Sequence, residues 1–184
     1  MMQAALTWRR VVPLLMALAV LTGCRTFTPT PLEQVPFQER AQTQSRSGVT
    51  VTVAIPSAEE ARALFDVKLY KKQIQPVWIE ISNATGETLG FLPRSVDAEY
   101  LSALEAAQKS HWTWSEKANR EKRAYFYANR MRYVVPPGET VAGFVYANRD
   151  LGARWVCVSV IGERLAEHFE FVFELPGFTA DYHR

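Results

Sequence analysis

The chain has 184 residues, 48% of them hydrophobic and 22% charged, which is enough apolar material for one globular domain and excludes disorder of the whole chain. The net charge of +2 comes from Arg9 and Arg10, because residues 24–184 contain 19 basic and 19 acidic side chains. Residues 24–184 are therefore neutral overall and lack the net positive charge that attracts nucleic acids, so we expect no nucleic-acid partner.

The first 23 residues have the three-part order of a secretory signal peptide. Arg9 and Arg10 form a positive region, residues 11–20 form an apolar run interrupted only by Pro13, and a glycine directly precedes Cys24. A membrane-spanning helix needs about 20 apolar residues, roughly twice the length of this run. We therefore expect residues 1–23 to be an export signal that is removed.

Residues 21–24, LTGC, resemble the lipobox of bacterial lipoproteins. The resemblance implies that the Cys24 thiol receives a diacylglyceryl group, that a peptidase cleaves before Cys24, and that palmitate-type chains anchor the protein. Two or more acyl chains hold a protein stably on a bilayer. Residue 25 is Arg rather than Asp, which, by similarity to enterobacterial lipoproteins, implies the periplasmic face of the outer membrane.

Residues 24–47 contain three prolines and many Thr, Gln and Ser residues, a composition typical of a flexible tether. The alternative is that the apolar residues of this segment, Phe27, Leu32, Val35 and Phe37, dock on the domain. We expect residues 48–184 to form a single β-rich domain.

The first part of this domain predicts a strand, a short helix and a hairpin. Val49, Val51 and Val53 alternate with polar residues, and Ser57 precedes Glu60 in a capping-box pattern that starts a helix over AEEARALF. Its inward residues are expected to be Ala61, Leu64 and Phe65. Residues 75–93 then read as a hairpin around NATGE, where the turn is a better interpretation than the glycosylation pattern it also matches.

The middle of the domain predicts two helices. Asp97 is expected to cap the first, over AEYLSALEAAQKS, with an inward face of Tyr100, Leu101, Leu104 and Ala107. The second covers SEKANREKRAYFYANRMRY, where Tyr125, Phe126 and Tyr127 form a broad aromatic face.

Three strands, TVAGFVYAN, RWVCVSVI and HFEFVFEL, follow the break at Pro136-Pro137-Gly138. Their links are short, which favours antiparallel pairing. The resulting prediction is a mainly β fold with helical insertions, an immunoglobulin-like antiparallel β-sandwich. The alternative is an α+β fold, in which an open antiparallel sheet carries helices on one face.

Two segments, LYKKQIQPVWIEISN and PPGETVAGFVYANRDLG, are similar to an uncharacterised family of small bacterial envelope proteins. The similarity spans roughly residues 65–178. It implies a shared fold and brings no activity with it.

Residues that carry chemistry are scattered through the sequence. Cys157 sits in an apolar strand and is expected to be a core thiol. Ser159 with His168 has no group that would orient the pair as nucleophile and base. Asp97 with Glu105 is explained better by a helix cap and a solvated helix turn than by a carboxylate pair of the glycosidase kind. The sequence has no metal-ligand spacing, no GxSxG, no phosphate-binding loop and no HExxH. We therefore expect a protein that is not an enzyme and that holds no metal or cofactor.

The second helix and its C-terminal extension carry a local charge of +4 with interleaved aromatic residues. This pattern suits a surface for anionic lipid or lipopolysaccharide. The alternative is a solvated helix whose basic side chains cover the core with their apolar stems. The basic residues are Lys117, Arg120, Lys122, Arg123, Arg130 and Arg132.

Three functions are compatible with these features. The leading hypothesis is a non-catalytic envelope lipoprotein, a binding or structural module whose partner is another envelope protein. The second is a binder of anionic lipid or lipopolysaccharide through the basic helix. The third is an envelope hydrolase whose site assembles from residues far apart in sequence.

Overall fold

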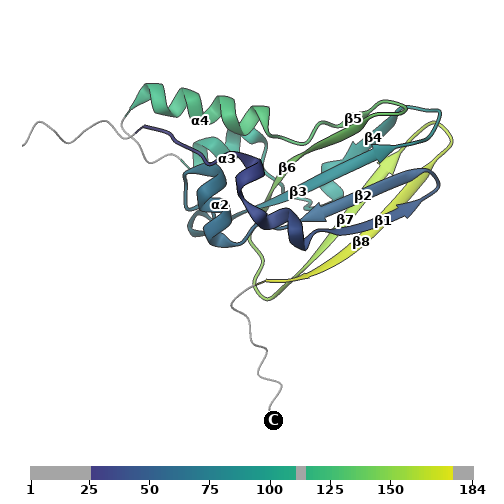
Figure 1. Cartoon of the computed structure of the whole chain (residues 1–184), viewed down its shortest axis with the longest axis horizontal. Coiled ribbons are helices and arrows are strands. Elements are labelled where there is room, and N and C mark those ends of the chain that lie inside the picture. Colours follow the sequence, from purple (N-terminus) through teal and green to yellow (C-terminus); the bar gives the residue numbers. More distant parts are fainter. Residues whose placement is uncertain (1–25, 111–114, 176–184) are drawn as a thin grey trace, which may run out of the picture.

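The computed structural model describes residues 26–110 and 115–175, and its strands form two antiparallel four-stranded sheets that face one another (Figure 1). The order in the first sheet is β1-β2-β3-β6 and in the second β5-β4-β7-β8. The predicted sandwich with helical insertions is thereby confirmed. The first sheet contains β1 (Gln42–Arg46), β2 (Val49–Ala54), β3 (Ile74–Asn83) and β6 (Thr140–Asn148). The second contains β4 (Leu89–Leu92), β5 (Val134–Val135), β7 (Ala153–Ile161) and β8 (Ala166–Glu174).

The strand connections have the immunoglobulin-like pattern. Strands β2, β3 and β4 correspond to strands A, B and C of an immunoglobulin domain, and β6, β7 and β8 correspond to E, F and G. The pairs β3–β6 and β4–β7 then match the pairs B–E and C–F. The short β5 pairs with β4 at the edge of the second sheet.

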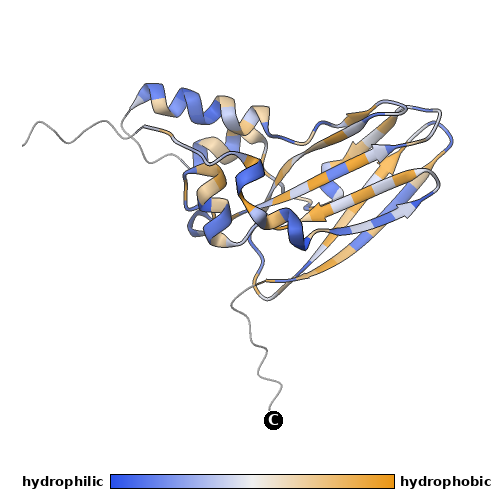
Figure 2. Cartoon of the chain, in the orientation of Figure 1, coloured by the Kyte–Doolittle hydropathy of each residue, from blue (hydrophilic) through white to orange (hydrophobic). Residues whose placement is uncertain are grey.

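Period-two patterning builds the core between the sheets, because alternate residues of a strand point to opposite faces. Val49, Val51 and Val53 are fully buried there, opposite Phe169 and Phe171 of β8. Figure 2 shows the corresponding alternation of hydrophobic and hydrophilic residues along the strands.

The helices gather at one end of the sandwich, opposite the end that carries the β3–β4 and β7–β8 turns (Figure 1). They cover a second hydrophobic cluster, in which the rings of Phe65 and Phe126 lie 4.9 Å apart and the rings of Phe126 and Tyr146 stack at 5.1 Å. The helices are α2 (Ala58–Phe65), α3 (Ala103–Lys109) and α4 (Glu116–Ala128). The short 3-10 segments are η2 (Leu32–Gln34), η3 (Pro36–Arg40), η4 (Leu69–Lys72) and η5 (Pro93–Ser95).

The start of α2 is confirmed and the predicted start of α3 is wrong. Ser57 and Glu60 form the expected capping box, and the inward residues of α2 are the expected ones. Helix α3 is capped by Ser102, which forms a capping box with Glu105. Asp97 instead accepts hydrogen bonds from the backbone N–H groups of Glu99, at 2.8 Å, and Asn148, at 2.7 Å.

This later start changes the buried face of α3. Ala103, Ala106 and Ala107 are buried, whereas Leu104 is 51% exposed. Tyr100 and Leu101 precede the helix, and the backbone N–H of Leu101 donates to the carbonyl of Tyr146 on the edge strand β6. These two residues therefore cover a sheet edge rather than a helix face.

The prediction of a flexible tether over 24–47 is wrong for its described residues, 26–47. Val35 and Phe37 are buried in the second cluster, and β1 pairs with β2 through all of its residues. Polar composition concealed a few apolar residues whose burial offsets the entropy of ordering the segment. The domain therefore includes residues 26–47, while the predicted export signal of residues 1–23 lies outside the described residues.

The β3–β4 turn is organised by Asn83, which is 2% exposed. Its side-chain amide donates to the carbonyls of Glu87, at 2.8 Å, and Val135, at 3.0 Å. Its side-chain oxygen accepts from the N–H of Thr85. The turn interpretation of NATGE is confirmed, and the hydrogen-bonding groups of the Asn83 side chain are used to hold this turn.

Candidate functional site

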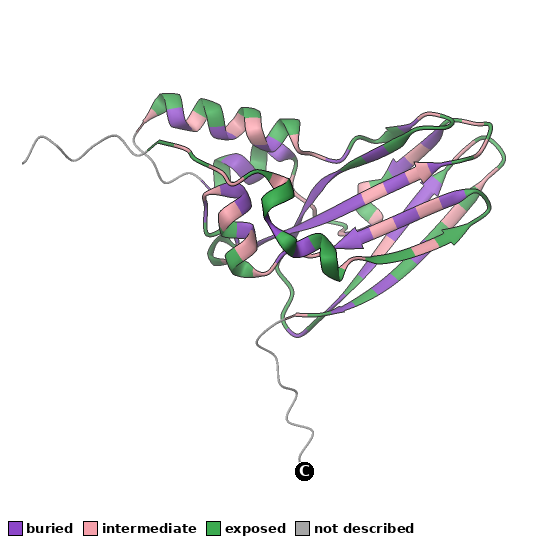
Figure 3. Cartoon of the chain, viewed as in Figure 1, coloured by how far each residue is buried: buried purple, intermediate pink, exposed green. Residues whose placement is uncertain are grey.

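Helix α4 presents three of the predicted basic residues on its outer side. Lys117 and Arg120 have 80% and 61% of their side chains exposed, and Arg123 is half-buried. Each of the first two pairs with a glutamate one turn away at 3.8 Å, Lys117 with Glu121 and Arg120 with Glu116. Such exposed pairs are weak and leave the cations accessible. Figure 3 shows this exposed stripe along α4.

The predicted accessibility of Lys122 is wrong, because its side chain is only 2% exposed. Lys122 follows Ala118 and precedes Phe126 by one helical turn each, and all three are buried residues of α4. Its ammonium donates a hydrogen bond of 3.3 Å to the carbonyl of Ser110. Lys122 therefore joins α4 to the end of α3 and faces away from solvent.

Arg130 and Arg132 lie beyond the C-terminus of α4, where the chain runs along β6. The guanidinium of Arg130 stacks 3.5 Å from the ring centre of Tyr127 and donates to the Tyr127 carbonyl at 2.6 Å. Arg132 is exposed. Five of the six predicted cations thus remain at or near the surface, and Cys24, the predicted lipid attachment residue, lies outside the described residues.

Ser159 and His168 are brought together on the outer face of the second sheet. They are direct cross-strand neighbours, and Ser159 Oγ lies 2.7 Å from His168 Nδ1. Ser159 is only 3% exposed, and its backbone N–H donates to Ser95 Oγ. Within the described residues no carboxylate orients the imidazole, so the pair lacks the third group of a catalytic triad.

Cys157 is half-buried on that same outer face, so the prediction of a core thiol is wrong. The inward residues of β7 are Val156, Val158 and Val160, and strand alternation directs Cys157 outward, opposite Glu170 of β8.

An apolar row accompanies Cys157 on the outer face. Trp155 and Val172 are direct cross-strand partners and are 60% and 50% exposed. Aromatic residues of this kind are enriched at protein–protein interfaces. Farther along the same face, exposed aliphatic residues lie on β4, β5 and β7: Leu92, Val134 and Ile161.

Asp97 and Glu105 are not a catalytic pair, because each belongs to a separate local structure. Glu105 caps α3, and Asp97 belongs to a buried network around Arg154 that the sequence analysis missed. Arg154 is 2% exposed and donates to Gln75 Oε1 at 2.8 Å and to the Asn148 carbonyl at 2.6 Å. The sequence does contain a signal for this network: Arg154 is a cation two residues before Val156 and therefore lies on the same inward face of β7.

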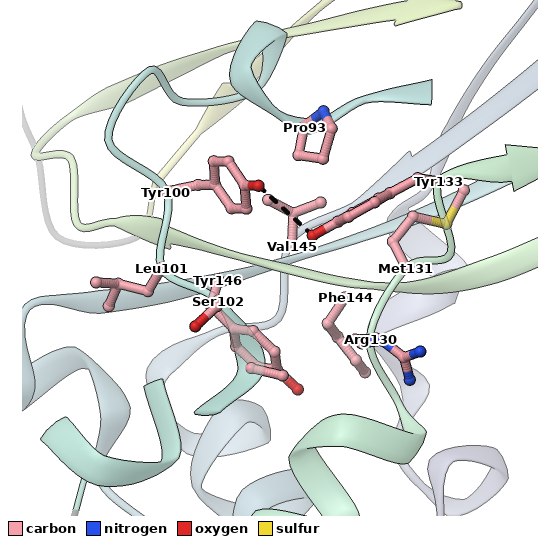
Figure 4. A pocket seen from close by; sticks show the side chains of 11 residues that line it. Pro93, Tyr100, Leu101, Ser102, Arg130, Met131, Tyr133, Phe144, Val145 and Tyr146 are labelled. Carbon is pink, nitrogen blue, oxygen red and sulfur yellow. Dashed lines mark hydrogen bonds between the residues drawn. The ribbon is translucent and has the colours of Figure 1, made fainter. Parts of the chain in front are cut away.

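Within the described residues, two of the cavities that border polar side chains are smaller than a typical small-molecule site of about 300 Å³ or more. One, of about 20 Å³, holds little more than a water molecule, and Tyr100 and Tyr133 point toward one another across it with hydroxyl oxygens 3.5 Å apart (Figure 4). Burial, with the hydrogen bond to Tyr100, raises the pKa of Tyr133 to about 12. The other, of about 250 Å³, lies between the Arg40–Glu60 ion pair and Phe173.

Two further properties concern the whole described part of the chain. Among residues 26–110 and 115–175, no three His, Cys, Asp or Glu side chains are grouped to bind a metal ion. In the same residues, no helix has the length and apolar character required to cross a membrane. Comparison with protein-family models, curated proteins and solved structures finds no match to the chain.

Proposed function

We propose that this protein is a non-catalytic lipoprotein of the bacterial cell envelope, held at the periplasmic face of the outer membrane by an acylated Cys24. The proposal rests on the export signal that ends at Cys24. The domain acts as a binding or structural module for another envelope protein.

The observation that carries the binding role is the exposed pair of Trp155 and Val172 on the outer face of the second sheet. Exposed apolar surface of this kind favours association when its neighbours are polar. On β8, Glu170 and Glu174 flank Val172 on the same face and are exposed. The complementary partner surface is therefore apolar at its centre and basic at its rim.

Affinity capture of the tagged, lipidated protein from envelopes tests this role. We expect an envelope protein that co-purifies with the wild type to be lost from Trp155→Glu. The matched control is Thr43→Glu, an exposed position of β1 in the other sheet. Equal recovery with both variants, both being folded by circular dichroism, would remove the second sheet from the binding role.

The second candidate function is binding of anionic lipid or lipopolysaccharide through α4. The observation that favours it is the accessibility of Lys117 and Arg120 on the helix and of Arg132 beyond it. Each basic side chain near an anionic membrane contributes about 1 kcal/mol.

A further inference from the structure

The N-terminal strap, residues 26–37, runs from the side of α4 across the helical end of the domain (Figure 1). The ring of Phe27 packs edge-on against Tyr125 of α4 at 5.5 Å. The N–H of Thr28 donates to the carboxylate of Asp66 at 3.2 Å, and the N–H of Thr30 donates to the carbonyl of Ala63 at 2.9 Å. The strap ends in buried Val35 and Phe37, so its course is fixed from Phe27 onward.

Only two residues separate Cys24 from Phe27. A fully extended chain spans at most about 3.6 Å per residue, so the Cα atom of Cys24 lies within about 11 Å of that of Phe27. Given the proposed lipid anchor, on which this step rests, the bilayer surface is held within that distance of the contact between Phe27 and α4. We infer that α4 lies against the bilayer and that its exposed cations contact anionic lipid headgroups.

The orientation of α4 about its axis suits this contact. The buried stripe of the helix is Ala118, Lys122 and Phe126, and at 100° per residue Arg120 and Tyr127 lie on the opposite side. Tyr127 is 51% exposed, and tyrosine is enriched at membrane interfaces. Lys117 flanks the same outer side with 80% of its side chain exposed.

The distances along α4 keep these groups within electrostatic range of the membrane. Helices rise about 1.5 Å per residue, so Arg120 lies roughly 8 Å along the axis from Tyr125, the residue in contact with Phe27. The screening length is about 10 Å at 0.1 M salt. The turn between β7 and β8 lies at the end of the domain opposite the helices (Figure 1).

Paramagnetic broadening of backbone amides on nanodiscs tests this orientation. The chain from Cys24 to Arg184, carrying Cys157→Ser, is coupled through Cys24 to a maleimide lipid in discs of phosphatidylcholine and phosphatidylglycerol that contain a gadolinium-chelate headgroup. We expect broadening to be strongest in α4 and the strap and weakest at Gly162 and Glu163. Insertion of a long Gly/Ser linker between Arg25 and Thr26 should even out the pattern.

Strongest broadening at the β7–β8 turn, or uniform broadening without the linker, would overturn the orientation. Lys117→Gln with Arg120→Gln should reduce broadening of α4 in anionic discs and leave it unchanged in discs of phosphatidylcholine alone. Equal broadening of this variant and the wild type in both discs would overturn the headgroup contact. Because the coupling is chemical, these results are independent of acylation in the cell. Mass spectrometry of the Cys24 peptide from envelopes tests the lipid anchor separately.

Discussion

The side-chain amide of Gln44 donates a hydrogen bond of 2.6 Å to the backbone carbonyl of Glu170, joining the edge strands of the two sheets. Gln42 and Arg46 make the same kind of bond to the carbonyls of Val172, at 2.8 Å, and His168, at 3.2 Å. The side chain of every second residue of β1 thus donates a hydrogen bond to every second backbone carbonyl along the free edge of β8. An unpaired edge is a template for association with another strand, and these side chains block it.

Gln42→Ala with Gln44→Ala should therefore destabilise the fold and open the edge of β8. We expect a loss of about 1 kcal/mol in unfolding free energy for each bond, measured by urea denaturation. Hydrogen exchange at residues 168–172 should accelerate. The control is Thr43→Ala, whose hydroxyl pairs with Thr52 within the first sheet. If the control accelerates exchange as much as the double variant, the side chains of β1 do not protect the edge.

Gly143→Ala should displace the segment that covers the edge of β6. A Cβ atom at residue 143 would lie 2.5 Å from the carbonyl carbon and oxygen of Arg130, which is backbone that must shift. Two hydrogen bonds are then strained, from Phe144 N–H to the Asn129 carbonyl and from Met131 N–H to the Phe144 carbonyl. We expect destabilisation of about 3 kcal/mol by thermal or urea unfolding. Gly86→Ala is the matched control, because nothing lies within 4 Å of its added Cβ. A Gly143→Ala protein as stable as the control would contradict the close approach.

The Arg40–Glu60 pair predicts an acid-sensitive contribution to stability. Burial opposes ionisation of Glu60, but hydrogen bonds from Arg40 and from the backbone and side chain of Ser57 prevail and lower its pKa below the ordinary value of 4.5. A lowered carboxyl pKa stabilises the folded state above pH 4.5, and this contribution is lost as the pH falls through the lowered pKa.

Glu60→Gln should consequently reduce the unfolding free energy at neutral pH by up to about 1 kcal/mol, because Gln can keep the capping box with Ser57 but loses the ion pair with Arg40. The difference from the wild type should shrink in acid, as measured by urea denaturation across pH. Glu59→Gln is the control, because Glu59 is exposed in the same helical turn. A difference for Glu60→Gln that stays constant between neutral and acid pH would argue against an ionised Glu60 in the pair.

Cys157 should react with a thiol reagent in the native protein, because its side chain is half-buried on the outer face of the second sheet. In a Cys24→Ser background it is the only thiol, and mass spectrometry counts the modified fraction directly. Cys157→Ser should change the unfolding free energy by less than about 1 kcal/mol, since the hydroxyl would lie on the outer face of the sheet and not in the core. If Cys157 were labelled only after unfolding, its side chain would be buried in the core and the prediction would be wrong.

Binding to anionic vesicles should fall in Lys117→Gln with Arg120→Gln. Two charges at about 1 kcal/mol each give at most a roughly 30-fold loss for the unlipidated chain at low salt. Arg94→Gln with Arg164→Gln removes the same charge from exposed positions away from α4 and serves as the control. Flotation of the three proteins with phosphatidylglycerol vesicles measures the difference, which high salt should erase. Equal losses in both variants would assign binding to net charge rather than to α4.

The strands and the start of α2 were predictable because their signals are local. Alternating Val49, Val51 and Val53 can bury only one face of a strand, and Ser57 with Glu60 satisfies the first turn of a helix wherever that helix lies. The start of α3 carried the same signal in Ser102 and Glu105, which the choice of Asp97 overlooked.

The errors concern positions where tertiary packing decides. The run around Cys157 has Arg154 in one phase and Ser159 in the other, so period-two reasoning meets a polar residue on each face and does not show which face is inside. Lys122 is charged, yet the neighbouring turns of α4 place it in a buried stripe. The Ser159–His168 contact depends on the register of β7 with β8, which no local pattern specifies.

The docked strap also limits where a lipid-anchored domain could meet its partners. A flexible tether of the 24 residues 24–47 would let the domain explore roughly 25 to 30 Å from its anchor, at about 5 to 6 Å times the square root of the residue number. Because the strap is fixed to the domain from Phe27 onward, the domain would instead keep one height above the membrane and one tilt angle relative to it. Its effective concentration is then high for partners that reach the same layer and close to zero for partners bound farther into the periplasm, such as those on the cell wall.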